Sequence, residues 1–176
     1  MDKVNPELQL VCDFVNTVDL EDGGDELADA AGLGRWLRTR GLWNGRPTTE
    51  DAVFAREARE ALRELMRANN ECDADRERAT EILDTVAART GITVRFDGGA
   101  LRVVAPSGGI GSVVAAAGQA MADGSWPRLK ACRADSCRWA FVDQAKNHSR
   151  IWCSMESCGN REKARAYRRR HGAAGA

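Results

Sequence analysis

Four of the six cysteines in the chain lie close together near its C-terminal end. They follow the spacing C-x4-C-x15-C-x4-C and are Cys132, Cys137, Cys153 and Cys158. Two close pairs joined by a loop can place four thiolates tetrahedrally around zinc, at about 2.3 Å from the metal. Four thiolates leave no coordination position for water or substrate, so the spacing predicts one structural zinc ion per chain and no catalytic metal. Two disulfides, or four unrelated thiols, are the alternatives.

The residues between and after the cysteines predict the elements that hold them. Trp139–Asp143 alternates like a β-strand, and Arg150–Trp152 is predicted to return as its partner strand. Asn160 is predicted to cap a helix that runs over residues 161–170. Few apolar residues follow Leu129, so metal binding would also have to supply the folding energy. A cysteine turn, a hairpin and a helix launched from the last ligand predict a treble-clef-like zinc module.

The charges of the chain are unevenly distributed along it. The total is neutral, with 26 basic and 26 acidic residues, which at first sight argues against a nucleic-acid partner. However, residues 1–127 carry 14 basic and 22 acidic residues, a net charge of −8, whereas residues 128–176 carry 12 basic and four acidic residues, a net charge of +8. Such asymmetry indicates two modules, one of them suited to a polyanion. A basic tail that only aids solubility is the alternative.

The predicted C-terminal helix presents most of this positive charge. We expect phosphate contacts from it and from the preceding loop, and a guanine contact from Arg161 near the helix start. Ala164 and Tyr167 are expected to pack back on the hairpin. The residues predicted to contact DNA are Lys146, Asn147, Arg150, Asn160, Arg161, Lys163, Arg165, Arg168 and Arg169.

The first 126 residues have the pattern of a mainly helical region. Apolar residues at helical spacing predict helices over residues 8–18, 33–39, 75–88 and 112–122. A further helix is predicted to start within residues 47–51, with a threonine as its N-cap, and to be broken by residues 69–73. Alternating residues on either side of Asp97-Gly98-Gly99 predict one β-hairpin over residues 92–105. The predicted fold class is therefore mainly α (α+β): a multihelical domain with one hairpin over residues 1–126, a zinc module over residues 127–171, and a disordered tail over residues 172–176.

Three polar residues in the first predicted helix share a face that is distinct from the apolar stripe. Asp13, Asn16 and Thr17 are three or four positions apart, so they could form the wall of a pocket for a small-molecule effector. A hydrogen-bonded or solvated helix face is the alternative.

The segment from Trp139 to Arg170 resembles the CGNR zinc finger. The family takes its name from the four residues Cys-Gly-Asn-Arg, which are Cys158 to Arg161 in this chain. Three other segments also fit the family pattern: Phe-Val-Asp143, Lys146-Asn147 and Trp152-Cys-Ser-Met. The opening phrase Leu10-Val-Cys-Asp-Phe-Val-Asn-Thr17 resembles the ABATE domain that commonly precedes this finger. The resemblance implies a stress-response transcription regulator with zinc on the four cysteines and DNA as its target.

Other classes of protein are disfavoured by the sequence. The two histidines, His148 and His171, both lie in basic surroundings, and no nucleophile–base–acid set can be assembled, so we expect no enzyme. No apolar run is long enough to span a membrane and no secretory signal is visible, so we expect a cytoplasmic protein. A DNA-binding regulator, with a homodimer left open, is the leading hypothesis. The alternatives are a module that docks on acidic protein surfaces and an enzyme of unknown chemistry in the first 126 residues.

Overall fold

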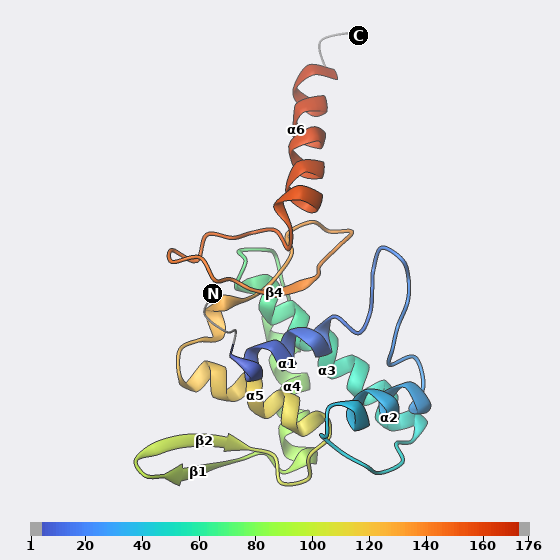
Figure 1. The fold of residues 1–176 in the computed structure, drawn as a ribbon, viewed down its shortest axis with the longest axis vertical. Coiled ribbons are helices and arrows are strands. Elements are labelled where there is room, and N and C mark those ends of the chain that lie inside the picture. The colour runs from blue at the N-terminus through green and yellow to red at the C-terminus, as the bar shows by residue number, and fades with distance from the viewer. Residues whose placement is uncertain (1–4, 173–176) are drawn as a thin grey trace.

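The computed structural model describes residues 5–172 of the chain (Figure 1). They form six α-helices and two antiparallel two-stranded sheets, which confirms the mainly helical α+β fold. The helices are α1 (Pro6–Val15), α2 (Ala30–Thr39), α3 (Thr49–Ala68), α4 (Arg76–Thr90), α5 (Ile110–Ala122) and α6 (Asn160–Gly172). The strands are β1 (Thr93–Asp97), β2 (Ala100–Val104), β3 (Leu129–Ala131) and β4 (Ala140–Val142). Residues 173–176 of the predicted tail lie outside the described residues.

Local capping sets where the long helices begin. The Thr48 hydroxyl accepts from the N–H of Asp51 at 3.1 Å, and the Asp51 carboxylate accepts from the N–H of Thr48 at 2.7 Å. This reciprocal capping box satisfies two backbone donors and starts α3 at Thr49. The Asp75 side chain caps α4 by a single hydrogen bond, which it accepts from the N–H of Arg78 at 3.0 Å. α4 ends at Gly91, whose φ of 67° lies in the left-handed region that glycine adopts without strain.

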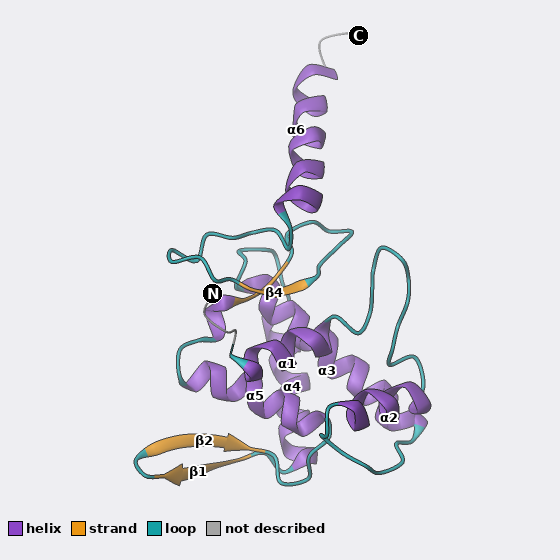
Figure 2. Ribbon diagram, in the orientation of Figure 1, coloured by secondary structure: helices purple, strands orange, loops and turns teal. Residues whose placement is uncertain are grey.

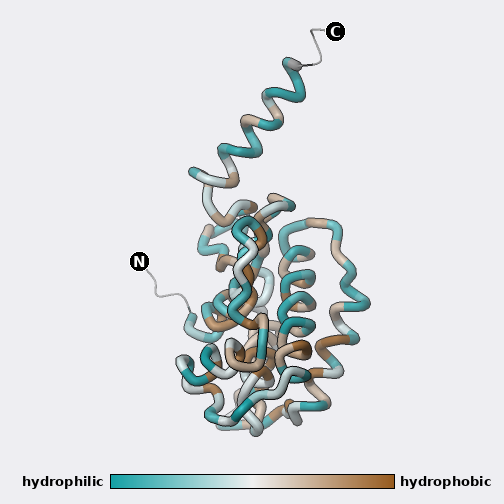
Figure 3. Tube along the Cα trace, turned by 90° about the vertical axis from the view of Figure 1, so that its right-hand side faces the viewer, coloured by the Kyte–Doolittle hydropathy of each residue, from teal (hydrophilic) through white to brown (hydrophobic). Residues whose placement is uncertain are grey.

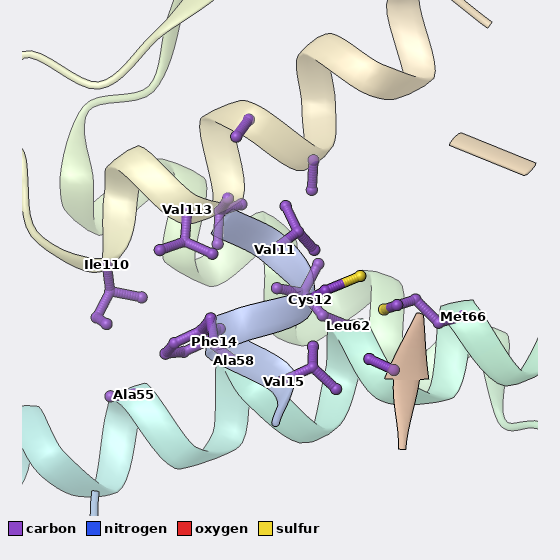
Figure 4. Packing of buried hydrophobic residues seen from close by; sticks show 14 of the residues in the cluster. Val11, Cys12, Phe14, Val15, Ala55, Ala58, Leu62, Met66, Ile110 and Val113 are labelled. Atoms are coloured by element: carbon purple, nitrogen blue, oxygen red, sulfur yellow. The ribbon is translucent and has the colours of Figure 1, made fainter. Parts of the chain in front are cut away.

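The hydrophobic core is centred on α1, which packs against α3 on one side and α5 on the other (Figure 4). Phe14 of α1, Leu62 of α3 and Val113 of α5 are all fully buried. The core extends beyond these helices, because Leu129 of β3 and Ala140 of β4 belong to the same cluster of buried residues. The short C-terminal sheet is therefore built onto the helical region.

The β1–β2 hairpin confirms the prediction for residues 92–105. Phe96 pairs with Leu101, and the turn between the strands uses Gly98 and Gly99 at positive φ. Both strands are largely exposed, and the hairpin extends from one side of the helices (Figure 2).

Three local predictions about the C-terminal region are wrong. β4 pairs with β3, not with Arg150–Trp152, because the apolar residues of β3 continue into the main core. Asn160 lies inside the helical segment, which begins one turn earlier in a π-helical turn, Met155–Gly159, capped by Ser154. Ala164 and Tyr167 are exposed, because α6 projects away from the body, and Tyr167 instead stacks on His171 within the helix (Figures 1 and 3).

Candidate metal centre and nucleic-acid interface

The four predicted cysteine ligands come together in space. Their Sγ atoms all lie within 4.8 Å of one another, and Cys153 Sγ lies 3.6 Å from the Sγ atoms of both Cys137 and Cys158. Four sulfurs around a tetrahedral ion at about 2.3 Å stand about 3.8 Å apart, so the spacing suits a metal such as zinc. All six cysteines lie within the described residues and are unpaired, so the disulfide alternative is not found.

The first cysteine pair is held by a tight turn that follows β3. The N–H of Cys137 donates to the carbonyl of Ala134 at 2.9 Å, and Arg138 adopts a positive φ of 51°. The Sγ of Cys132 accepts a hydrogen bond from the N–H of Ala134, and the Sγ of Cys137 accepts one from the N–H of Trp139. Each sulfur thus receives a backbone donor from two residues further along, which stabilises negative charge on it.

The second pair flanks the π-helical turn. Cys158 is buried, and the next residue, Gly159, is closely covered by two side chains. A Cβ on Gly159 would lie 2.5 Å from Met155 Sδ and 3.2 Å from Trp152 Cδ1, closer than packed atoms approach. A larger residue here would require the Met155 side chain, which is half exposed, to move. The Asn160 side chain in turn donates to the carbonyl of Glu156 at 3.2 Å and so ties the start of α6 to the turn.

The cysteine thiols differ in acidity because they share protons. A hydrogen bond from the Cys137 thiol lowers the pKa of Cys132 to about 5, despite burial. The same hydrogen bond raises the pKa of Cys137. Burial, followed by repulsion from the Cys132 thiolate, raises the pKa of Cys153 to about 12. A cation bound by all four sulfurs must therefore displace protons, and its affinity must fall as the pH is lowered.

Arg161 connects the last cysteine to the N-terminal region. Its Nη2 lies 3.1 Å from Cys158 Sγ and also donates to the carboxylate of Glu21. Glu21 belongs to the acidic loop, which we define as residues 19–29 between α1 and α2. Hydrogen bonds to Glu21 and then to Cys158 raise the pKa of Arg161, so the residue predicted to read a base is fully charged and already paired.

A buried ion pair organises the loop that follows β4. Asp143 is fully buried and accepts from Lys130 Nζ at 2.8 Å and from the N–H groups of Ala145 (2.9 Å) and Arg150 (3.0 Å). Burial acts to raise the pKa of Asp143, but these hydrogen bonds outweigh it and hold the pKa below its usual value. Lys130 also donates to the carbonyl of His148. The sequence reasoning missed Lys130, because only its position opposite Phe141 of β4 reveals its role.

Side chains of α3, and of residues just after α1 and α3, bond to the backbone within or beside the cysteine-rich region, which we define as the segment between Cys132 and Gly159. Asn16 donates to the carbonyl of Ala140 at 2.9 Å and accepts from its N–H at 2.7 Å. Asn70 donates to the carbonyls of Ala131 (2.8 Å) and Ile151 (2.9 Å). Arg63, which is buried, donates to the carbonyl of Arg138 at 2.9 Å. These bonds position the cysteine turns on the helical region.

The three predicted pocket residues are in two different environments. Asp13 and Asn16 line an open cleft between α1 and the cysteine-rich region. Thr17 is buried instead, and its hydroxyl donates to the carbonyl of Phe14 at 2.8 Å and accepts from Arg59 at 3.3 Å. Thr17 therefore faces the protein interior and does not line this cleft.

The nine predicted DNA-contacting residues are all exposed, but they form two groups. Lys146, Asn147 and Arg150 lie on the loop held by the Lys130–Asp143 pair, and the other six lie on α6. α6 is hydrophilic along most of its length and extends well clear of the body (Figure 3). Its basic residues are therefore open to a large partner on several sides.

The fold and the sulfur cluster define a small helical protein with a zinc-finger type of C-terminal region. Residues 128–171 match the family model of the CGNR zinc finger. Residues 8–124, which are more than half of the chain, match the ABATE family, described as "Putative stress-induced transcription regulator". The chain therefore belongs to the ABATE family, with a CGNR zinc finger after it. No curated protein matches the chain. Among residues 5–172, no helix combines the length and apolar character needed to cross a membrane.

Proposed function

We propose that this protein is a DNA-binding transcriptional regulator whose C-terminal region folds around one structural zinc ion. The observation that carries the proposal is that an exposed basic helix, α6, begins two residues after Cys158, the last of four clustered sulfurs. A bound zinc ion would hold the two cysteine pairs together and so fix the direction in which α6 leaves the body. Membership of a regulator family supports the same conclusion.

Two kinds of DNA contact follow from the charges. Lys163, Arg165, Arg168 and Arg169 on α6 would bind phosphates, which gives affinity but no sequence preference. Arg161 would contact a guanine edge, and Lys146, Asn147, Asn160 and Arg150 would add contacts around the start of the helix. Arg161 must first leave Glu21, because one guanidinium edge cannot serve both partners.

The proposal is tested with fluorescence anisotropy on a duplex selected from a random DNA pool. The logarithm of affinity should fall linearly with the logarithm of salt concentration, by about 0.9 per phosphate contacted. Arg165→Ala should weaken binding and reduce this slope by about one. Arg95→Ala, on the exposed β1 strand, is the matched control and should bind like the wild type. The proposal would be overturned if the full-length protein did not bind duplex DNA at low salt. It would also be overturned if the protein bound duplex DNA equally well after zinc chelation.

The main competing function gives a different result in the same assay. A module that docks on acidic protein surfaces should bind a labelled polyglutamate peptide through α6 and show no stable complex with duplex DNA. In the structure α6 binds the carboxylate of Glu21 through Arg161, and this carboxylate belongs to the same chain.

We also propose that the helical region binds a small-molecule effector in the cleft beside Asp13 and Asn16. The cleft lies between the helical region and the cysteine-rich region, so an occupant would contact both. The homodimer and the cytoplasmic location stay predictions, to be checked by sedimentation velocity and by cell fractionation.

A further inference from the structure

The cleft beside Asp13, which we call the junction cleft, has a volume of about 530 Å³. One wall carries Asp13 of α1 and Arg40, the residue after α2. The opposite wall carries Trp139, Phe141 and Arg150 of the cysteine-rich region. The site is therefore complete only when both parts of the chain are folded.

The first wall presents two opposite charges that form an ion pair too long to be a hydrogen bond. Arg40 Nη2 lies 3.8 Å from Asp13 Oδ2, and the guanidinium is held over the Trp36 ring at 4.3 Å. Gln9 donates to Asp13 Oδ1 at 2.8 Å, which fixes the carboxylate and leaves Oδ2 with only the long ion pair to Arg40. Within residues 5–172 the Arg40 guanidinium donates no hydrogen bond, so it and Asp13 Oδ2 can both bind a ligand.

The opposite wall supplies a flat apolar surface. The Trp139 side chain is 37% exposed, which is unusual for an indole next to buried strand residues. Cys12 forms part of the cleft floor. Burial, and then the charge of Asp13, raise the pKa of Cys12 to about 12, so its side chain is a neutral thiol and adds to the apolar surface.

The balance of charge in the cleft selects against simple ions. Asp13 and Glu26 are matched by Arg40 and Arg150, so a ligand with only one charge meets repulsion as well as attraction. A zwitterion can satisfy both kinds of charge. We propose that the junction cleft binds an α-amino acid with a flat apolar side chain, its ammonium on Asp13, its carboxylate on Arg40 and its side chain on Trp139. This inference deepens the effector part of the proposed function.

The same cleft reaches the region proposed to bind DNA through Arg150. The Arg150 guanidinium lies 4.7 Å from the Phe141 ring, and it donates to the carbonyls of Trp152 (2.9 Å) and Cys153. Its backbone N–H donates to Asp143, so Arg150 also helps to hold the loop that carries Lys146. An amino acid in the cleft therefore lies against a residue that supports both a sulfur ligand and the loop.

The test is calorimetric titration of the full-length, zinc-loaded protein with L-phenylalanine, L-tyrosine and L-tryptophan. At least one should bind saturably. The binder's decarboxylated amine and its deaminated acid, for phenylalanine 2-phenylethylamine and 3-phenylpropanoate, should each bind at least tenfold more weakly. Asp13→Asn and Arg40→Gln should each weaken binding at least tenfold, whereas the exposed controls Asp84→Asn and Arg95→Gln should not change it.

Two further measurements distinguish loss of ligand binding from loss of folding and locate the ligand beside Trp139. Zinc content and far-UV circular dichroism should be unchanged in Asp13→Asn and Arg40→Gln, which shows that both variants fold. L-phenylalanine should change the tryptophan fluorescence of the wild type but not of Trp139→Phe if it is the binder. No binding by any of the three amino acids, or binding that survives both cleft substitutions, would overturn the inference. These experiments contain no DNA. Their outcome therefore does not depend on whether the protein binds DNA.

Discussion

The helical region between Pro6 and Ala122 and the cysteine-rich region between Cys132 and Gly159 are stabilised in different ways. The helical region buries large apolar side chains, such as Phe14 and Leu62, in one continuous core. The cysteine-rich region has a separate cluster whose buried members are only Cys132, Ala134 and Cys158. So little apolar surface cannot offset the entropy of ordering the chain, so we expect the second region to depend on a metal ion bound by the four sulfurs.

The boundary between these two kinds of stabilisation does not coincide with the change in charge. β3 and β4 lie in the basic part of the chain, yet Leu129, Ala131 and Ala140 belong to the main core. Asn16, Asn70 and Arg63 then bond to the backbone beside the cysteines. Removing the first 126 residues would expose these strands to water, so contact between the acidic and basic parts is better tested by single substitutions.

The largest effect should come from removing the metal. Chelation of the wild type, or Cys153→Ser, should abolish zinc binding and specific DNA binding and unfold the two cysteine turns and the start of α6. The α1–α5 core should remain folded, because its contacts do not involve the sulfurs. Hydrogen exchange measures this directly: protection should be lost in residues 132–138 and 151–172 and kept in α3 and β4.

The control for this experiment is Cys72→Ser, which changes a cysteine that is not among the four clustered sulfurs. It should bind one zinc ion per chain like the wild type. Zinc affinity of the wild type should also weaken as the pH falls, since the raised pKa values of Cys137 and Cys153 mean that protons compete for these sulfurs. Loss of protection throughout α3 on chelation would contradict the comparison.

A substitution in the hydrophobic core should lower the stability of the helical region. Phe14→Ala removes a fully buried ring that packs 5.3 Å from the ring of Trp36 and should lower the free energy of unfolding by about 3–5 kcal/mol. Urea denaturation followed by circular dichroism measures this effect. The loss should be nearly the same with and without chelator, and a loss seen only in the zinc-loaded protein would show that the two regions are not independent.

Lys130→Met should destabilise the join between the regions. It leaves the buried Asp143 carboxylate without its cation, which should cost about 3 kcal/mol at pH 7. Lys163→Met, on the exposed face of α6, is the control and should leave stability unchanged. In a urea series, Lys130→Met combined with Asp143→Asn should recover part of the loss, because no charge is then buried alone.

The smallest effect should come from Glu21→Gln. It removes the carboxylate that pairs with Arg161 and should raise DNA affinity by about two- to fivefold, since exposed ion pairs are weak. Asp22→Asn, which neutralises the neighbouring acid in the same loop, should have a smaller effect. Anisotropy at low salt gives the comparison; equal affinities for Glu21→Gln and the wild type would show that the acidic loop does not compete with DNA.

The sequence predicted the main elements because their signals are local. Thr48, Asp75 and the glycines of the β1–β2 turn act through neighbours a few residues away, and α3, α4 and the hairpin formed near the places that those signals indicated. The first helix was predicted to reach Val18 but ends at Val15, because Val18 instead forms a β-bridge to Asp25. The four cysteines were also identifiable, because their spacing is characteristic of a metal site. The pairing of β4 could not be identified from the sequence. Its partner is β3 because the apolar residues of β3 pack into the main core.

The residues of the candidate cleft were also only partly predictable from the sequence. Asp13 and Asn16 could be placed on one helix face by their spacing, but the equal spacing of Thr17 did not reveal that its hydroxyl turns inward to Phe14 and Arg59. Arg40, Trp139 and Arg150 had no common signal in the sequence. Trp139 and Arg150 meet Asp13 because β4 docks on α1, and Arg40 meets it because Trp36 of α2 packs on Phe14 of α1.

The sequence by itself therefore determined the helices, the hairpin, the four sulfur ligands and the separation of charge, all of which depend on residue type and short spacing. The tertiary structure alone decided that the basic strands complete the helical core, that Lys130 supports the loop after β4, and that Glu21 meets Arg161 across 140 positions. The physical reason is that burial and pairing over long separations depend on how elements pack, and packing is a property of the whole chain.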